Sequence, residues 1–216
     1  MENGVGTIAV VDYGMGNLRS VWQALAHVAG RREVVVTGDA AVVASAERVV
    51  FPGQGAMLDC MRELDARGLR SAVLDAAKNK PFLGICIGLQ MLFEHSEEGD
   101  VPGLGLFRGR VRRFPTERMA TPEGVRLKVP HMGWNEVMQE RPHVLWKGID
   151  DGARFYFVHS YYVAPEDRAC VAATTRHGIP FTSVVARDNI FAMQFHPEKS
   201  AAAGLVLLSN FIGWMP

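Results

Sequence analysis

Cys86 stands in a pattern that can make a cysteine reactive. It follows the apolar run 82–85, which predicts a buried strand, and it lies between Gly84 and Gly88. The next residues fit an amphipathic helix over 87–94. Strand, sharp turn, nucleophile and helix make up a nucleophile elbow, here with sulfur in place of a hydroxyl. The turn leaves no room for a Cβ at the flanking glycines, and a helix N-terminus favours the thiolate. A buried structural cysteine is the alternative.

His196 is the best candidate for the base that a cysteine nucleophile needs. It ends the apolar run 191–195, and Pro197 after it favours extended backbone at His196. Residues two apart in an extended segment point the same way. Glu198 can therefore approach the imidazole and orient it. A strand end with a surface histidine and glutamate is the ordinary alternative.

The remaining histidines divide into two groups. His27 lies within an amphipathic helix pattern, and His95 and His177 lie in polar turn-like segments, so a surface position is expected for each. The others are harder to dismiss as surface residues: His131, His143 and His159.

Two further segments carry groups that acyl transfer requires. Its tetrahedral intermediate needs two N–H donors for the oxyanion. Ile87, directly after the nucleophile, supplies one in other elbows. The Gly53–Gln54 peptide can supply the second, because glycine permits either orientation of that peptide. Gln90 lies one helical turn after the nucleophile and can hydrogen-bond a polar substrate. A plain turn at 52–55 and a buried-edge glutamine are the alternatives.

The composition limits the class of protein. The 216 residues are 48% hydrophobic and 21% charged, which is typical of a globular chain with a sizeable core. The net charge is zero, so neither nucleic acid nor a membrane is an expected partner. The three cysteines, Cys60, Cys86 and Cys170, form no disulfide framework and no metal motif. No signal peptide or membrane span is recognisable, so a cytoplasmic location is expected.

The order of the predicted elements favours an α/β fold. In the first half, strands at 7–11, 33–37, 48–51 and 82–85 alternate with helices at 17–29, 41–44, 57–77 and 87–94. This alternation predicts a largely parallel central sheet flanked by helices. The second half predicts mixed or antiparallel strands at 106–114, 126–130, 154–162, 170–175, 181–186 and 190–195, then a helix at 201–214. No linker is visible, so residues 1–216 are expected to form a single domain.

The chemically equipped turns follow strands of the predicted sheet. Residues 12–14 follow the first strand, 52–55 the third, and Cys86 the fourth. Ligands of an open α/β sheet bind outside the carboxyl ends of its strands. The three turns are therefore expected to meet at one edge of the sheet.

Several segments together resemble the class I, triad-type glutamine amidotransferases. They are VDYGMGNLRSV (11–21), FPGQGAM (51–57), GICIGLQ (84–90), PHMGWN (130–135), YFVHSYYV (156–163) and QFHPEKS (194–200). Within that class they resemble the glutaminase subunits of imidazole glycerol phosphate synthase, an enzyme of histidine biosynthesis. The resemblance implies a flavodoxin-like fold without a cofactor, and hydrolysis of glutamine through a cysteine thioester.

The resemblance also implies a role for each candidate residue. Cys86 would attack the carboxamide of glutamine, His196 would carry the proton, and Glu198 would orient His196. The amino-acid end of glutamine would be held by Gln90, Ser160, Tyr161 and the backbone around Gly53.

A partner is implied as well. In this family the ammonia passes to a separate (β/α)₈ synthase subunit, so the chain is expected to form a heterodimer. That subunit combines ammonia with a phosphorylated ribulosyl–carboxamide intermediate, giving imidazole glycerol phosphate and an aminoimidazole carboxamide ribotide. Residues 13–17, 130–135 and Lys199 would lie toward the partner.

Two other classes of function stay open on the sequence. A stand-alone cysteine hydrolase or peptidase on a similar scaffold would turn over without a partner. A non-catalytic regulatory subunit would keep the fold and lose activity, although the intact set of Cys86, His196 and Glu198 argues against it.

Overall fold

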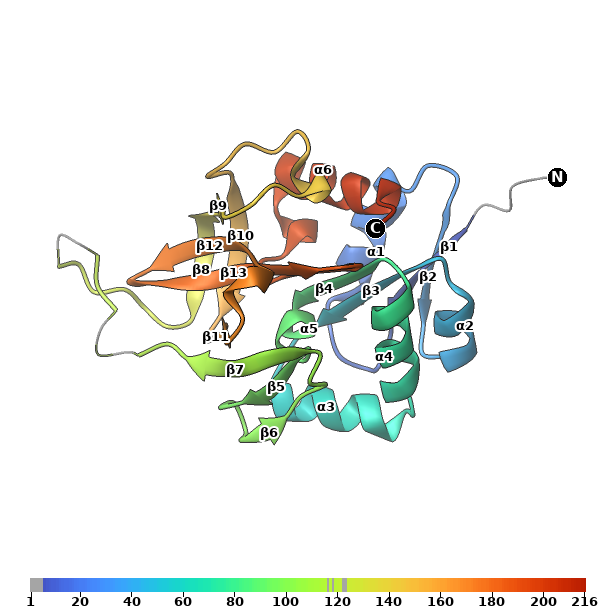
Figure 1. Ribbon diagram of the computed structural model, residues 1–216, viewed down its shortest axis with the longest axis horizontal. Helices are drawn as coiled ribbons and strands as arrows, with labels where there is room; N and C mark the ends of the chain where they lie inside the picture. Colours follow the sequence, from blue (N-terminus) through green and yellow to red (C-terminus); the bar gives the residue numbers. More distant parts are fainter. Residues whose placement is uncertain (1–5, 116, 118, 122–123) are drawn as a thin grey trace.

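Four parallel strands form the part of the sheet that leads to Cys86 (Figure 1). The computed structural model describes residues 6–115, 117, 119–121 and 124–216. The strands pair in the order β2-β1-β3-β4: they are β1 (Thr7–Val11), β2 (Glu33–Thr37), β3 (Arg48–Gly53) and β4 (Phe82–Cys86). All four predicted strands are confirmed to within two residues. β1, β3 and β4 are almost entirely buried, which explains their continuous apolar runs.

Helices cover both faces of this parallel sheet (Figure 1). On one side α1 (Leu18–Val28) packs against α6 (Ala201–Gly213), and on the other lie α3 (Met57–Ala66) and α4 (Arg70–Asn79). The short α2 (Ala40–Ser45) contacts α4. The predicted helices at 17–29, 41–44 and 201–214 are confirmed, with ends that differ by one residue.

The prediction that 57–77 contains one long helix is wrong, because the chain forms the two ten-residue helices α3 and α4 there. Gly68 lies between them in the left-handed region, with a φ of +67°. The amide of Leu69 donates to the carbonyl of Leu64, and the amide of Gly68 to that of Asp65. This is the hydrogen-bond pattern of a glycine-terminated helix, and the apolar spacing that runs on into α4 concealed it.

The helix predicted at 87–94 is also wrong beyond its first turn. α5 spans only Ile87–Gln90, and β5 (Phe93–Ser96) follows it. The carbonyls of Leu92 and Phe93 accept hydrogen bonds from residues 105–107, and β5 pairs in parallel with β7 (Phe107–Arg113). Pairing with a later segment therefore overrides the local helical pattern, and Cys86 precedes a single helical turn with little dipole of its own.

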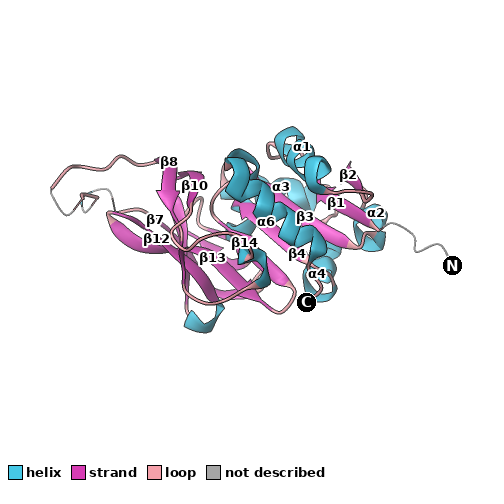
Figure 2. Ribbon diagram, turned by 90° about the horizontal axis from the view of Figure 1, so that it is seen from above, coloured by secondary structure: helices cyan, strands magenta, loops and turns pink. Residues whose placement is uncertain are grey.

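The second half adds mixed and antiparallel strands to the sheet, as predicted (Figure 2). Beyond β4 the order continues β14-β13-β11-β7-β5-β6, with β12 and β9 to one side. These strands are β6 (Val101–Pro102), β9 (Met138–Gln139), β11 (Tyr161–Pro165), β12 (Val171–His177), β13 (Ile179–Arg187) and β14 (Ile190–Met193). A separate two-stranded sheet joins β8 (His131–Glu136) to β10 (Arg154–His159).

Two strand predictions in the second half need correction. The strand at 126–130 is wrong: Arg126 makes only an isolated bridge to Ala120, and the strand begins at His131. The strand at 154–162 is two strands, β10 and β11, interrupted at Ser160, and each belongs to a different sheet. That interruption places Ser160 and Tyr161 where the two sheets meet.

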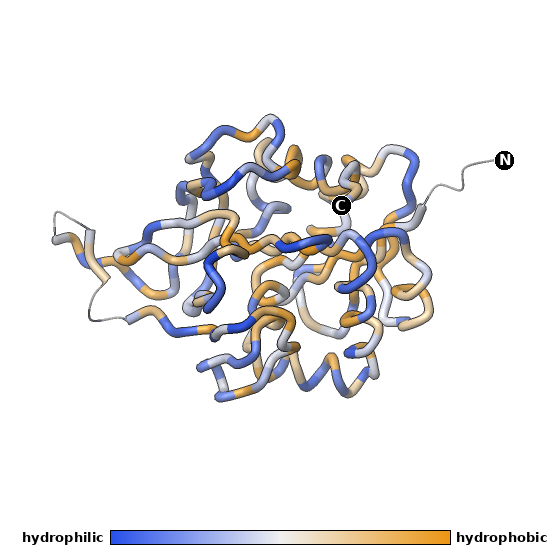
Figure 3. The backbone as a smooth tube through the Cα atoms, in the orientation of Figure 1, coloured by the Kyte–Doolittle hydropathy of each residue, from blue (hydrophilic) through white to orange (hydrophobic). Residues whose placement is uncertain are grey.

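The core lies between the sheet and its helices. Hydrophobic segments, orange in Figure 3, run through the middle of the molecule, and hydrophilic segments are frequent in the outer loops. Within the described residues, no helix combines the length and the apolar run needed to cross a membrane. The sequence predicts no signal peptide at the N-terminus, and the first five residues of that segment lie outside the described residues.

Candidate active site

Cys86 has the backbone of a nucleophile elbow. It is the last residue of β4, with φ +55° and ψ −111°, a conformation that costs a non-glycine residue energy. A Cβ on Gly84 would lie 2.8 Å from the Cβ of Ala192, and one on Gly88 would lie 1.9 Å from the carbonyl oxygen of Phe51. The predicted need for both glycines is confirmed, and the close approach of β3 and β14 is its cause.

His196 and Glu198 are in contact, as expected, but by a different route. Nδ1 of His196 lies 2.8 Å from Oε1 of Glu198, and the glutamate side chain is only 1% exposed. His196 is extended, whereas Glu198 lies in the 3₁₀ turn η4 (Pro197–Lys199). The turn, and not a continuous extended segment, brings the carboxylate back to the ring. Ser200 holds the turn by donating to the carbonyl of His196 and accepting from the amide of Tyr156.

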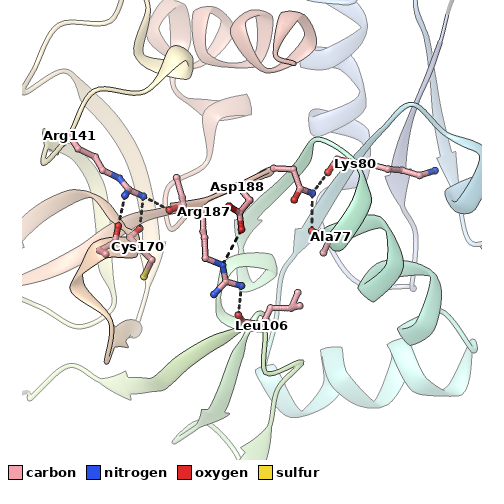
Figure 4. A network of polar contacts seen from close by, with 10 residues as sticks. Ala77, Lys80, Leu106, Arg141, Cys170, Arg187 and Asp188 are labelled. Carbon is pink, nitrogen blue, oxygen red and sulfur yellow. Dashed lines mark hydrogen bonds and ion pairs between the residues drawn. The ribbon is translucent and has the colours of Figure 1, made fainter. Parts of the chain in front are cut away.

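The turn between β13 and β14 holds the strand that leads to His196 (Figure 4). Arg187 donates to the carbonyl of Leu106 at 2.6 Å, and Asn189 donates to the carbonyls of Ala77 and Lys80. Beside this turn, Arg141 donates to the carbonyls of Ala169, Cys170 and Ala186. The anchored turn keeps β14 in parallel register with β4, and the chain continues from β14 directly to His196.

Opposing effects act on the charge of His196. Burial lowers the pKa of this imidazole, but the charge of the Cys86 thiolate and the Glu198 carboxylate together raise the pKa to about 10. His196 Nε2 is buried and has no hydrogen-bond partner among the described residues. The raised pKa favours the protonated imidazole, which holds a proton at the pocket over Cys86.

A pocket of about 250 Å³ opens over Cys86. Most of the predicted site residues line it: Gln54, Cys86, Ile87, Gln90, Ser160, Tyr161 and His196. Glu198 lies behind the ring of His196, and Gly53 pairs with Cys86 across the sheet. The carboxyl ends of β3 and β4 therefore meet at one site, as expected from the order of the strands.

The strand end that carries Gly53 is fixed on both sides. The hydroxyl of Tyr13 donates to the carbonyl of Pro52 at 2.9 Å, and the thiol of Cys60 contacts the carbonyl of Gln54 at 3.5 Å. A Cβ on Gly53 would lie 2.7 Å from both the Tyr13 hydroxyl and the Cβ of Ile87. The Gly53–Gln54 peptide thus lies between two anchored carbonyls.

Gln194 is a residue of the site to which the sequence assigned no role. Its Nε2 lies 3.7 Å from Sγ of Cys86, and its Oε1 accepts from Gln90 at 3.0 Å. The sequence carried one signal: a glutamine in the apolar run before His196 must be buried, and a buried amide needs partners. Nothing in the sequence indicated which partners these would be.

The three histidines left open make hydrogen bonds within the protein, and His159 also lines the pocket over Cys86. His131 and His159 hydrogen-bond each other at 2.9 Å, and burial lowers the pKa of each to about 3. His143 accepts from the amide of Leu145 at the start of η2 (Val144–Trp146), and burial lowers its pKa to about 4.

The surface histidines agree only in part with expectation. His27 is exposed, but His177 is partly buried and stacks on His131 with ring centroids 4.1 Å apart. His95 is also partly buried and lies 3.2 Å from Asp100. In the described part of the chain, no group of three His, Cys, Asp or Glu side chains is arranged to hold a metal ion.

Comparison with known proteins gives consistent matches. The family "Glutamine amidotransferase class-I" matches residues 9–213. The protein named imidazole glycerol phosphate synthase subunit HisH in Dechloromonas aromatica is 71% identical over 210 residues, 97% of both chains. That of Aromatoleum aromaticum is 68% identical over 97% of this chain and 99% of its own.

Solved structures share the fold at low identity. A glutamine amidotransferase matches with a TM-score of 0.71 and 17% identity, covering 98% of this chain and 100% of its own. PurLQS from Thermotoga maritima matches with a TM-score of 0.69 and 17% identity, covering 96% of this chain and 98% of its own. These structures support the α/β architecture alone.

Proposed function

We propose that Cys86, His196 and Glu198 form the catalytic triad of a glutaminase, because this chain belongs to the class I glutamine amidotransferase family. The chain is the glutaminase subunit of an imidazole glycerol phosphate synthase in histidine biosynthesis. One observation carries the triad assignment. His196 Nδ1 is held by Glu198, while the buried Nε2, which has no partner among the described residues, belongs to a ring that lines the pocket over Cys86. A histidine held in this way can pass a proton between sulfur, substrate and water.

Each chemical step uses these three groups. The thiolate of Cys86 attacks the carboxamide carbon of glutamine, and the C–N bond breaks as His196 gives its proton to the leaving nitrogen. Ammonia departs and leaves a thioester on Cys86. Water then attacks the thioester and gives a proton to His196, and glutamate leaves as the thiolate forms again. Glu198 keeps the ring oriented and stabilises its charge throughout.

Backbone donors and the pocket wall complete the proposed site. The N–H groups of Ile87 and Gln54 stabilise the oxyanion, with Gly53 allowing the Gln54 N–H to face it. The amino-acid end of glutamine is held by Gln90, Ser160 and Tyr161. Gln90 supports this assignment, because its buried Oε1 has no partner among the described residues and can accept from the substrate.

The finer features of the assembly are proposals too. The partner is a (β/α)₈ synthase subunit in a heterodimer, which uses the ammonia to make imidazole glycerol phosphate and aminoimidazole carboxamide ribotide. The relatives' description as subunits supports a partner. Met132 and Trp134 on β8, 63% and 44% exposed, offer it apolar area near the pocket residue Pro130. Lys199 is exposed at the same pocket.

One residue assigned to that interface is excluded from it. Tyr13 is completely buried, so within residues 13–17 only the remaining positions can contact a partner. We also propose that residues 1–216 form a single class I glutamine amidotransferase domain, in keeping with a family match over 9–213. A cytoplasmic location is proposed as well, and the three free cysteines suit a reducing compartment.

Substitution of the nucleophile tests the proposed function. Cys86→Ala should abolish glutamine-dependent synthesis by the complex, while synthesis from added ammonia continues at the partner's site. Cys170→Ser is the matched control and should keep glutaminase activity, and Cys60→Ala, which removes the contact to the carbonyl of Gln54, should lose far less activity than Cys86→Ala. Normal glutamine-dependent turnover by Cys86→Ala would disprove the assignment, and equal loss in a control would mean that another sulfur is the nucleophile.

Partner dependence distinguishes this function from a stand-alone hydrolase. Glutaminase activity is measured for the chain alone, with the synthase subunit, and with the subunit plus its nucleotide ligand. The Gly53–Gln54 peptide can point its N–H away from Cys86 when no partner is bound, so the chain alone should be slower by about 10²–10³, the usual effect of one missing oxyanion donor. Equal rates in all three assays would favour a hydrolase that works by itself.

A further inference from the structure

The amide groups of Gln90 and Gln194 are oriented by one backbone carbonyl. Gln90 Nε2 lies 3.1 Å from the oxygen of Tyr161 and 3.0 Å from Gln194 Oε1. A carbonyl oxygen only accepts, so the Gln90 atom that faces Tyr161 must be the nitrogen. The same nitrogen faces Gln194, so the Gln194 atom opposite it must be the oxygen. The nitrogen of Gln194 is then the atom that faces Cys86, 3.7 Å from Sγ.

Neutral histidines hold that carbonyl in place. Nδ1 of His159 lies 2.8 Å from the oxygen of Tyr161, so this nitrogen carries the hydrogen and Nε2 accepts from His131 at 2.9 Å. His131 in turn accepts from the amide of Asn135 at 3.1 Å, and Asn135 also donates to the carbonyl of Arg176. The direction of every hydrogen bond in this chain follows from the two backbone carbonyls at its ends.

The burial of these amides makes the hydrogen bonds consequential. Gln194 is completely buried and Gln90 is 1% exposed, so neither amide can exchange its partner for bulk water. The nitrogen of Gln90 is occupied by two acceptors, and its oxygen has no partner in the described part of the chain. Gln90 lines the pocket, so this oxygen is available to a substrate that donates hydrogen bonds, as glutamine does.

We propose that Gln194 is a positioning residue of the glutaminase reaction. Its amide nitrogen donates to the Cys86 thiolate, and its oxygen fixes the amide of Gln90 so that Oε1 can accept from glutamine. This role rests on the proposed function and extends it. One side chain thereby couples the orientation of the nucleophile to that of the substrate-binding glutamine.

Titratable groups also surround Cys86. His196 faces the sulfur from the end of β14, Tyr13 from the turn after β1, and Cys60 from α3. The other titratable residues that line the pocket are Glu98, His159, Tyr161 and Lys199. All of these remain in place in Gln194→Met, which adds no titratable group, so a shift in that variant reports the contact with Gln194.

Two substitutions separate the two contacts of Gln194. Gln194→Met keeps the size but removes both donor and acceptor. Gln194→Glu keeps an acceptor for Gln90 and removes the donor to sulfur. Alkylation of Cys86 by iodoacetamide is followed against pH by mass spectrometry of its peptide, and kcat and KM for glutamine are measured in the complex with the synthase subunit.

Both variants should react with iodoacetamide at higher pH than the wild type, by about one unit for Gln194→Met. The kcat should fall about 10- to 100-fold, the usual effect of losing a hydrogen bond to a charged group. KM should rise in Gln194→Met and stay within about twofold in Gln194→Glu, which still holds Gln90. The split in KM is a result that simple loss of packing would not produce.

Gln139→Met is the matched control, because it makes the same chemical change at a glutamine that donates to the carbonyl of Ile149, away from the pocket. It should leave the alkylation curve, kcat and KM unchanged. Wild-type alkylation curves in both Gln194 variants would overturn the inference, even if activity fell. If the wild-type complex lacks Cys86-dependent glutaminase activity, the proposed function fails, while the alkylation curves still test the contact between Gln194 and sulfur.

Discussion

His196 and His159 line the same pocket and are both buried, yet the pKa of one is raised and that of the other lowered. Burial disfavours the charged imidazole at both positions. The ring nitrogens of His159 bond the carbonyl of Tyr161 and the neutral ring of His131, and its pKa falls to about 3. Around His196, the Cys86 thiolate and the Glu198 carboxylate outweigh burial.

This difference teaches that the charge of the neighbours, more than burial, assigns a histidine its role. The charged side of the pocket, formed by Cys86, His196 and Glu198, holds a proton that can be transferred. The neutral side, formed by His131 and His159, makes hydrogen bonds of fixed direction. They position the carbonyl of Tyr161 and, through it, Gln90. The two sides come from different segments of the chain, so a substitution can change a residue of one side while every residue of the other side stays in place.

Removing the charged imidazole should give the largest effect. His196→Ala should lower glutaminase kcat in the complex by roughly 10⁴–10⁶, as for the proton carrier of other triads. Synthesis from added ammonia should continue. His27→Ala, at an exposed histidine, is the control and should be normal. Activity within tenfold of the wild type would show that His196 is not the proton carrier.

Removing only the carboxylate should cost less. The loss of kcat in Glu198→Ala should be roughly 10- to 100-fold smaller than the loss in His196→Ala, because the orientation of the ring is lost but the proton carrier remains. The substitution also removes one group that raises the pKa of His196, so NMR titration should find this pKa below the value of about 10 in the intact protein. Greater damage from Glu198→Ala than from His196→Ala would reverse the two roles.

The neutral side should make the protein sensitive to acid. The unfolded chain takes up protons near pH 6.5, whereas folded His131 and His159 do so only near pH 3. The free energy of unfolding should therefore fall as the pH drops through this window. Each of the two histidines contributes up to about 1.4 kcal/mol for every pH unit. Stability that depends on His196 behaves oppositely: it is present below pH 6.5 and is lost as the pH rises toward 10.

Urea unfolding between pH 4 and pH 7 measures this slope. His131→Gln should reduce it, and His27→Gln should leave it as in the wild type. The same slope in His131→Gln and the wild type would contradict the account of the neutral pair.

The smallest effect should come from making the neutral side resemble the charged one. Asn135→Asp places a carboxylate about where the amide lies 3.1 Å from His131 Nε2, much as Glu198 faces His196. The pKa of His131 should then rise by about one to two units from its value of about 3, which NMR titration of the ring can follow. Asn210→Asp on α6, where the amide donates to the carbonyls of Leu145 and Lys147, is a control for the amide-to-acid change. An unchanged His131 would mean that burial alone sets its pKa.

The predicted and the missed parts of the fold differ in how far their determinants extend along the chain. The strands that alternate with helices before Cys86 were recognisable from their own apolar runs. The end of α5 was not, because the backbone of residues 92–94 pairs with residues 103–107 instead of continuing the helix. The break at Gly68 was local, yet apolar spacing on both sides of it imitated one helix.

The sequence by itself determined the elbow at Cys86, because the strand, the two glycines and the sharp turn all lie within a few residues. It also determined that His196 and Glu198 could approach each other, since Pro197 and the short spacing limit where they can go.

Tertiary structure alone decided which side chains surround them. Gln194 is 108 residues from Cys86 and contacts it only because β14 pairs with β4. The neutral pair His131 and His159 likewise depends on the register of β8 with β10. Local backbone preferences are set by neighbouring residues, whereas hydrogen-bond partners and pKa values depend on segments that only packing brings together.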